Sequence, residues 1–281
     1  MADEAVIAMI RALHVKRRYY IAQRLAAEAR LMAFLRTQLG WRLDLPSEVR
    51  KRIEKDAISL AGDWQNHPRG AEFVRIIEAT RSSAAPFDAQ ERELDRMISA
   101  EVAKLPIAAW WQANVFNVLG SLGSIIGEAG DLSNYSNPAK LWKRMGLGVI
   151  EGRRQGAPGK DATADDWIAH GYSPARRAVM WNIAASLVRK KSPVFYPIYI
   201  ARKEYELPRR ATKKHADNCA RRYMEKQLLV MLWNAWRAAE AATFDGEALG
   251  VQPTDATQKC DEAGASPAVF IDAAVERCAP C

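Results

Sequence analysis

Apolar residues recur at steps of three and four positions through residues 3–39 of this 281-residue chain. That spacing places them along one stripe of an α-helix, while Lys and Arg occupy the other faces. Gly40 ends the pattern. A helix of this length needs a partner for its apolar stripe, so we predict that it pairs with a second helix as a hairpin or coiled coil. We also expect it to mediate self-association, which would make the protein a homo-oligomer.

The helical pattern continues beyond this first helix. A helix restarts at Pro46 and runs to Gly62, and residues 82–86 indicate a break between two later helices. We found no strand pattern in residues 1–105 and predict a helical hairpin or coiled-coil region there. The fold class predicted for the whole chain is all-α.

Residues 125–148 predict a short helix, a turn and a basic helix. Gly130-Asp131 ends a run of small apolar residues, and Asn137-Pro138 is a helix start signal. The second helix carries both apolar and basic side chains before Gly146 and Gly148 release the backbone. We predict that this unit opens a basic helical domain over residues 106–242, with a flexible basic loop at residues 152–171.

Basic residues are concentrated between Lys140 and Lys226. This segment holds 20 Lys+Arg against 8 Asp+Glu, a balance of +12, whereas the whole chain carries +8. Such a segment neutralises phosphates and favours a polyanionic partner, DNA first. The predicted DNA-binding residues are Lys140, Lys143, Arg144, Arg153, Arg154, Lys160, Arg176, Arg177, Arg189, Lys190 and Lys191.

Aromatic residues are interleaved with these cations and leave two interpretations open. Trp110-Trp111 opens an apolar stretch, and we expect packing rather than base stacking there. Tyr and Trp at helical spacing between residues 192 and 242 fit a core and a nucleic-acid surface equally well.

The last segment, residues 243–281, changes to small residues and acids. From Glu240 to Cys281 there are 8 acids and 2 bases, a balance of −6. This composition predicts a flexible, disordered acidic tail.

The four cysteines are Cys219, Cys260, Cys278 and Cys281, and only the last two form a C-x-x-C pair. Without a second pair of ligands nearby, we expect reduced thiols, no metal site and no cofactor. No apolar run approaches the roughly 18 to 20 residues of a membrane span, and the first residues lack a basic signal segment. We therefore expect a cytoplasmic protein with no membrane partner.

Three ordered segments resemble the C-terminal region of the IS-one-ten class of insertion-sequence transposases. They read GEAGDLSNYSNPAKLWKRMGLG, then GYSPARRAVMWNIAASLVRKKSPVFYPIYIARKEYE, then HADNCARRYMEKQLLVMLWNAW. The resemblance covers roughly residues 10–240 and is most specific over 118–236. It implies a helix-hairpin-helix domain that follows a helical hairpin, and a role in DNA transposition, with a guide RNA as a further partner.

The chain departs from that family at its catalytic positions. The resemblance implies a strand-bearing domain with four magnesium-binding carboxylates, and the helical residues 1–105 offer no strands for it. It also implies a nucleophilic serine, but Arg154 stands at the matching position, and a guanidinium cannot attack a phosphodiester. Ser173 is the nearest other hydroxyl, although it precedes a proline as a helix N-cap would. Phe116-Asn117-Val118 replaces the glycines that free phosphate-binding amides in the family's hairpin.

The sequence thus predicts a DNA-binding protein that is involved in or derived from DNA transposition, without complete catalytic machinery. Whether it is an enzyme stays open. One alternative is an active transposase subunit that is completed by a separate acidic catalytic domain. Another is a helical RNA-binding or scaffold protein.

Overall fold

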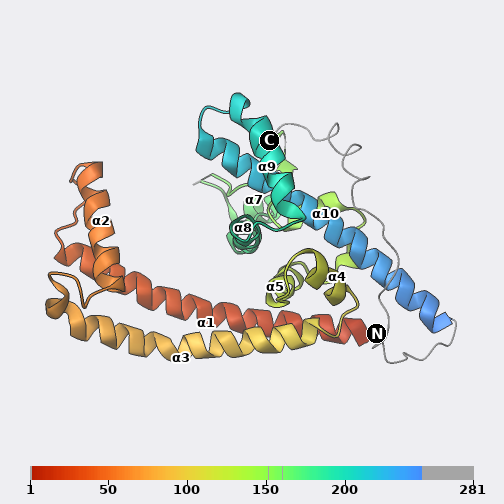
Figure 1. Cartoon of the computed structure of the whole chain (residues 1–281), viewed down its shortest axis with the longest axis horizontal. Helices are drawn as coiled ribbons and strands as arrows, with labels where there is room; N and C mark the ends of the chain where they lie inside the picture. Colours follow the sequence, from red (N-terminus) through yellow and green to blue (C-terminus); the bar gives the residue numbers. More distant parts are fainter. Residues whose placement is uncertain (1, 151, 160, 249–281) are drawn as a thin grey trace. The chain divides into compact units, whose positions relative to one another are not determined.

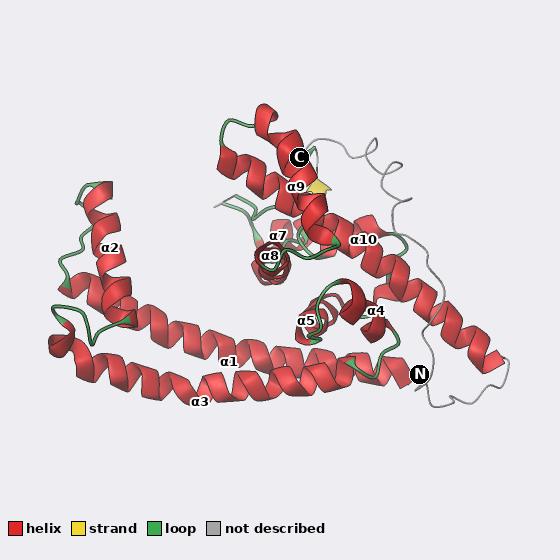
Figure 2. Cartoon of the chain, in the orientation of Figure 1, coloured by secondary structure: helices red, strands yellow, loops and turns green. Residues whose placement is uncertain are grey.

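The structure is a computed structural model that describes residues 2–150, 152–159 and 161–248. Nearly all of these residues are helical, and the described part of the chain contains a single pair of short strands (Figure 2). The predicted all-α class is therefore confirmed. Residues 243–248 of the predicted tail continue the last helix, and residues 249–281 lie outside the described residues.

The chain divides into two compact units. The first comprises Met1–Lys104 and Leu122–Gly127, and the second comprises Leu105–Ser121 and the chain from Glu128 onward. The short helix α5 (Gly120–Ala129) therefore contributes to both units.

The first unit is built on two long helices, α1 (Ala2–Gln38) and α3 (Gly70–Val102), which lie side by side (Figure 1). The shorter α2 (Ser47–Gly62) packs against α1. Apolar side chains from all three helices form a buried cluster, whose members are Leu31, Leu35, Ala57, Leu60, Phe73 and Ile77. This cluster buries the C-terminal part of the apolar stripe of α1, and Ile7, Ile10 and Leu13 of the same stripe are also buried.

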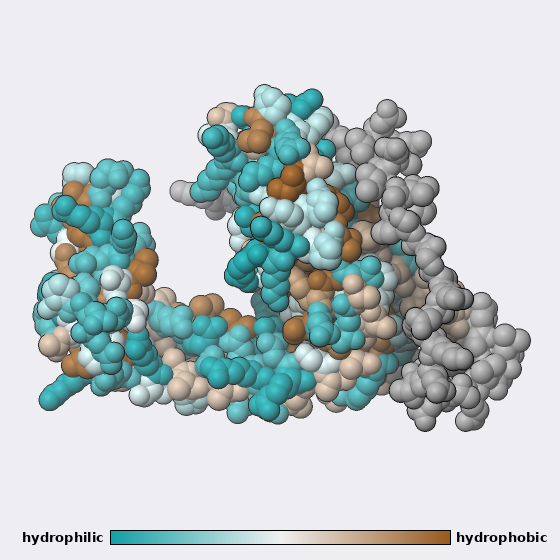
Figure 3. All heavy atoms as spheres, viewed as in Figure 1, coloured by the Kyte–Doolittle hydropathy of each residue, from teal (hydrophilic) through white to brown (hydrophobic). Residues whose placement is uncertain are grey.

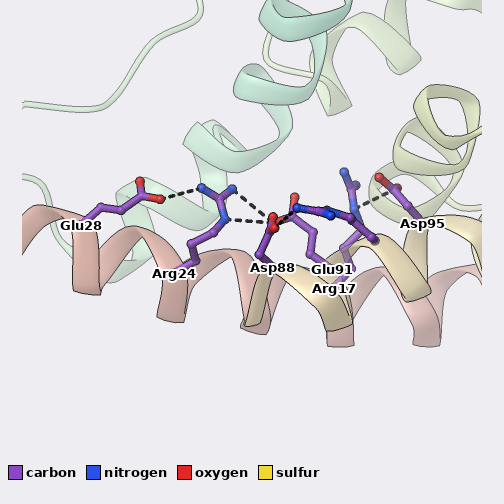
Figure 4. Close-up of polar contacts among 7 residues, drawn as sticks. Arg17, Arg24, Glu28, Asp88, Glu91 and Asp95 are labelled. Atoms are coloured by element: carbon purple, nitrogen blue, oxygen red, sulfur yellow. Dashed lines mark hydrogen bonds and ion pairs between the residues drawn. The ribbon is translucent and has the colours of Figure 1, made fainter. Parts of the chain in front are cut away.

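Ion pairs link α1 to α3 along the hairpin (Figure 4). Arg17 Nε lies 3.0 Å from an Asp95 carboxylate oxygen, and Arg24 bridges Glu91 at 3.1 Å and Glu28 at 3.0 Å. Burial raises the pKa of the Asp95 carboxyl even though Arg17 opposes that shift. The Arg17–Asp95 and Arg24–Glu91 pairs fix how the two helices meet, because each joins α1 to α3, whereas Arg24–Glu28 lies within α1.

The predicted break at residues 82–86 is wrong, because α3 runs through it with Pro86 inside the helix. Proline lacks the N–H that would bond the carbonyl of Ser82, so this turn loses one hydrogen bond. Both residues are exposed, and the free carbonyl can be hydrated. Packing of α3 against α1 then keeps the helix continuous.

The second unit is organised around α10 (Lys213–Ala248), which packs against elements from across the unit. Buried Leu228, Leu229 and Leu232 line its inner face. The other elements are α4 (Ile107–Asn114), η1 (Leu132–Asn134), α6 (Pro138–Arg144), β1 (Val149–Ile150), β2 (Arg153–Arg154), α7 (Ala164–His170), α8 (Pro174–Arg189), α9 (Phe195–Glu206) and η2 (Leu207–Arg209). Trp111 of α4 is fully buried, so the packing role expected for it is confirmed.

The start of α6 follows the predicted signals. Gly130 takes a left-handed conformation with φ of 84° just after α5. The Asn137 side chain accepts a hydrogen bond of 3.1 Å from the Lys140 backbone N–H, and Pro138 occupies the first helical position. The predicted sequence of helix, turn and basic helix is present.

The segment predicted as a flexible basic loop, residues 152–171, contains regular structure. Strands β1 and β2 pair antiparallel in a hairpin, with Ile150 opposite Arg153. Further on, α7 begins at a capping box in which Thr163 and Asp166 bond each other's backbone and side-chain groups. The polar composition concealed these elements because both are short and expose most of their side chains.

The exposed surface of the first unit mixes polar and apolar residues. On the visible face of the α1–α3 hairpin, apolar side chains are scattered among hydrophilic ones (Figure 3). Across the described residues, no helix has the length and apolar character needed to cross a bilayer. The cytoplasmic location stays a prediction.

Candidate nucleic-acid interface

A pocket of about 320 Å³ lies within the second unit, between the β1–β2 hairpin, α8 and α10. We call it the arginine pocket. It is lined by Arg154, Gln155, Gly156, Ala157, Tyr172, Arg177, Trp181, Asn218 and Arg222. No carboxylate is among these described lining residues, so the wall itself carries only positive formal charge.

Gln155 holds one side of the pocket in place. Its side chain is 2% exposed; its Oε1 accepts a 3.0 Å hydrogen bond from Gly148 N, and its Nε2 donates to the His170 carbonyl at 3.2 Å. The hairpin is thereby tied to the end of α7. A Cβ atom at Gly148 would lie 3.0 Å from Gln155 Oε1. Gly146 has a φ of 74°, and a Cβ atom there would lie 3.3 Å from Arg177 Cβ. The two glycines allow the chain to pass this close.

Two of the pocket arginines are fixed by buried groups. Arg177 donates a 3.0 Å hydrogen bond to the carboxylate of Glu225, and Arg222 donates to the Gly148 carbonyl at 3.0 Å. Burial raises the pKa of Glu225, against the opposing attraction of Arg177. Even with Glu225 ionised, the three arginines that line the pocket outnumber this one carboxylate by two.

Trp181 supplies an aromatic wall. Two guanidinium groups lie near its ring, with Arg177 Cζ 5.8 Å and Arg221 Cζ 5.4 Å from the ring centre. Cation–π contacts of this kind hold the ring and the arginines together. The residue is still 41% exposed, so part of its surface remains open to a ligand.

Three lining groups keep hydrogen-bonding capacity. Among the described residues, the Arg154 guanidinium, the Tyr172 hydroxyl and the Asn218 amide have no hydrogen-bond partner. All three can donate, and donors beside arginines match a ligand rich in acceptor oxygens.

Exposed cations lie on α6 and on the hairpin that carries Arg154. The backbone of Lys143 lies beside Gly148, since a Cβ there would meet Lys143 Cα at 3.3 Å, so the end of α6 adjoins the base of the hairpin. Lys140 is exposed one turn earlier on α6, and Arg153 and Arg154 are exposed on β2. We call Lys140, Lys143, Arg153 and Arg154 the basic rim.

Three other predicted DNA-binding residues have partners inside the unit. Arg144 donates to the Glu128 carbonyl at 3.1 Å, and Arg176 lies 3.6 Å from the Glu128 carboxylate. Arg177 pairs with Glu225 as described above. These contacts hold the three side chains in place, so none of them can swing out to a strand without losing an interaction, although Arg177 still lines the arginine pocket where it stands.

The remaining predicted cations lie elsewhere. Arg189, Lys190 and Lys191 are exposed at the far end of α8, about 20 Å from Arg176 by helix rise. Lys190 Nζ lies 5.1 Å from the centre of the Phe116 ring. Lys160 lies outside the described residues.

Ser173, the weak catalytic candidate, caps α8. Its side-chain oxygen accepts from the Arg176 backbone N–H at 3.4 Å, and Pro174 follows at the first helical position. Cys219 is buried, and the other three cysteines lie outside the described residues.

Many further Arg and Lys side chains are bonded to acids of the second unit. Glu206 is fully buried between Arg202, at 2.7 Å, and Arg210, at 2.5 Å. Asp217 accepts from Arg221 at 2.8 Å and from Lys203 at 3.2 Å. Much of the positive excess counted in the sequence is therefore used internally.

The polar wall of the arginine pocket was not predicted from the sequence. Tyr172, Asn218 and Arg222 were not among the predicted site residues. A signal was present, because Asn218 and Arg222 are four residues apart on α10, as Arg177 and Trp181 are on α8. Side chains at that spacing share one helix face.

Comparison with known proteins returned no significant match to a family model, to a curated protein or to a solved structure.

Proposed function

We propose that the second unit binds the sugar-phosphate backbone of DNA through the basic rim, and that the chain takes part in, or derives from, DNA transposition. The observation that supports binding is that Lys140, Lys143, Arg153 and Arg154 are all exposed on α6 and the neighbouring hairpin, and that the described wall of the pocket lined by Arg154 has no carboxylate. The link to transposition rests on the ordered sequence resemblance alone.

Binding of this kind is electrostatic. A lysine or arginine that neutralises a phosphate releases a counterion, so the affinity falls steeply as salt rises. Contacts to phosphates position a protein on the strand but carry little sequence information. We therefore propose binding with weak sequence preference. We also propose that this chain alone does not cleave the strand, because Arg154 stands where the resemblance implies a nucleophilic serine.

A salt series with fluorescent duplex DNA tests the proposal. The logarithm of the binding constant should fall linearly with the logarithm of the salt concentration. Removing a rim cation by Lys143→Gln or Arg153→Gln should weaken binding to every sequence and reduce the slope by about 1.

Lys55→Gln is the matched control, because it removes the same charge from an exposed position on α2 of the first unit. An equal loss in the control would assign binding to net charge rather than to the rim. A slope near zero for the unmodified protein would contradict the proposal. Tighter binding to RNA of the same length would move the proposal to RNA.

A further inference from the structure

The arginine pocket differs from the basic rim in being concave and in having an aromatic wall. Its volume of about 320 Å³ falls at the lower end of the roughly 300–1,000 Å³ typical of small-molecule sites. A phosphate group alone would leave much of this space to water. A whole nucleotide would use both the cationic wall and the exposed part of Trp181.

The charge of the pocket favours a phosphomonoester over a phosphodiester. Arg154, Arg177 and Arg222 line it, and Glu225 behind the wall offsets one of these charges. A phosphomonoester carries about −1.5 to −2 near pH 7 and offers three acceptor oxygens. A phosphodiester inside a strand carries a single charge, so it would match the pocket less well.

The open hydrogen-bonding groups agree with the same ligand. Arg154, Tyr172 and Asn218 line the pocket together with Trp181, and their donor groups have no hydrogen-bond partner among the described residues. Charged acceptors make the strongest bonds to such donors, and a base can stack on an indole face. We propose that the arginine pocket binds a nucleotide through its terminal phosphomonoester, either at the end of a DNA strand or as a free mononucleotide.

This inference deepens the proposed function and rests on it for the strand-end case. Short single-stranded DNA that carries a 5′-phosphate, a 3′-phosphate or only hydroxyl ends is the probe, with the dye attached away from the tested end. We expect about tenfold tighter binding for one phosphorylated end, which corresponds to one added charge-assisted contact.

Two variants remove single polar groups from the pocket with little risk to folding. Tyr172→Phe deletes only a hydroxyl, and Asn218→Ala introduces a better helix former within α10. Each should reduce the preference for the phosphorylated end to about twofold. The matched controls Tyr196→Phe and Asn182→Ala, which lie outside the pocket wall, should keep it.

A competition experiment distinguishes a free mononucleotide from the end of a DNA strand as the ligand. Displacement of the phosphorylated strand by deoxyadenosine monophosphate at a similar concentration would assign the pocket to the free nucleotide, and weak displacement would assign it to the strand end. Equal binding of all three end types, with no effect of either pocket variant, would overturn the inference.

Closed circular single-stranded DNA has no ends and therefore reports the basic rim alone. If it binds with a steep salt slope while end phosphorylation has no effect, the inference fails and the proposed function stands. If it does not bind but the phosphorylated oligonucleotide does, the proposed function fails and a mononucleotide site remains.

Discussion

Buried carboxylates determine where the arginines of the second unit point. Glu206 is the clearest case, since it is fully buried yet accepts from Arg202 at one carboxylate oxygen and from Arg210 at the other. Burial by itself would raise the pKa of this carboxyl, but the hydrogen bonds and charges of the two arginines outweigh burial and lower the pKa. The ionised carboxylate is therefore the form that the fold stabilises.

Glu206→Gln should destabilise the protein by about 2–4 kcal/mol at neutral pH, because it leaves two arginines beside a neutral amide. Since the folded pKa is lowered, the contribution of Glu206 is complete above its unfolded pKa and is lost as the pH falls through the folded value. The difference between the variant and the unmodified protein should therefore shrink in acid. Urea unfolding at pH 7 and across the acid range measures both effects.

Glu204→Gln is the control for this substitution, because Glu204 is exposed on the same helix and has no described ion pair. We expect a change within about 0.5 kcal/mol for it. Equal stability of both variants would mean that Glu206 does not hold its arginines in solution.

At the scale of the element, two prolines inside helices differ in their effect. Pro86 lies in the middle of α3, where it removes a hydrogen bond to Ser82. Pro197 is the third residue of α9, where the backbone N–H has no acceptor within the helix in any case. Both prolines are exposed, so a difference in burial does not explain the difference in their effect on stability.

Pro86→Ala should stabilise the first unit by about 1–2 kcal/mol. The restored N–H and the better helix propensity stabilise the variant. The greater conformational entropy of its unfolded chain offsets about 0.4–1 kcal/mol of this gain. Pro197→Ala should change stability by much less. Chemical denaturation followed by circular dichroism compares the two, and a destabilised Pro86→Ala would show that α1 packs against a bend that proline creates.

Elements with a clear apolar period were predictable, and those without one were not. The stripe of α1 and the Asn137-Pro138 start of α6 follow from local chemistry, so the sequence was sufficient for them. The β1–β2 hairpin depends on Gln155 joining Gly148 to His170, which are 22 residues apart. No local pattern encodes such a bridge.

The candidate site shows the same division. The sequence identified the cations of α6 and β2, because charge is visible in composition. It could not tell that Arg177 is paired with Glu225 while Arg154 has no described partner. That distinction depends on how α8 and α10 meet, which is a tertiary contact.

At the scale of the whole molecule, the long hairpin of the first unit has apolar side chains that its own core does not bury. Several apolar side chains on α1 stay open to solvent, with exposed fractions of 66% for Val15, 59% for Tyr19 and 50% for Leu25. Val15 and Tyr19 are four residues apart and share one face. Burying them would be favourable in proportion to the area removed from water.

We therefore expect the chain to form homo-oligomers through α1. Val15→Lys combined with Tyr19→Lys places two like charges on that face and should shift the protein toward monomer in sedimentation velocity. Leu43→Lys is the control, since Leu43 is 76% exposed in the α1–α2 connection, away from this face. Because linked binding units raise avidity without new contacts, monomeric variants should also bind long DNA more weakly than the control, while their affinity for short duplexes should change little. If the unsubstituted protein sediments as a monomer, the prediction of self-association is wrong and each second unit would bind DNA on its own.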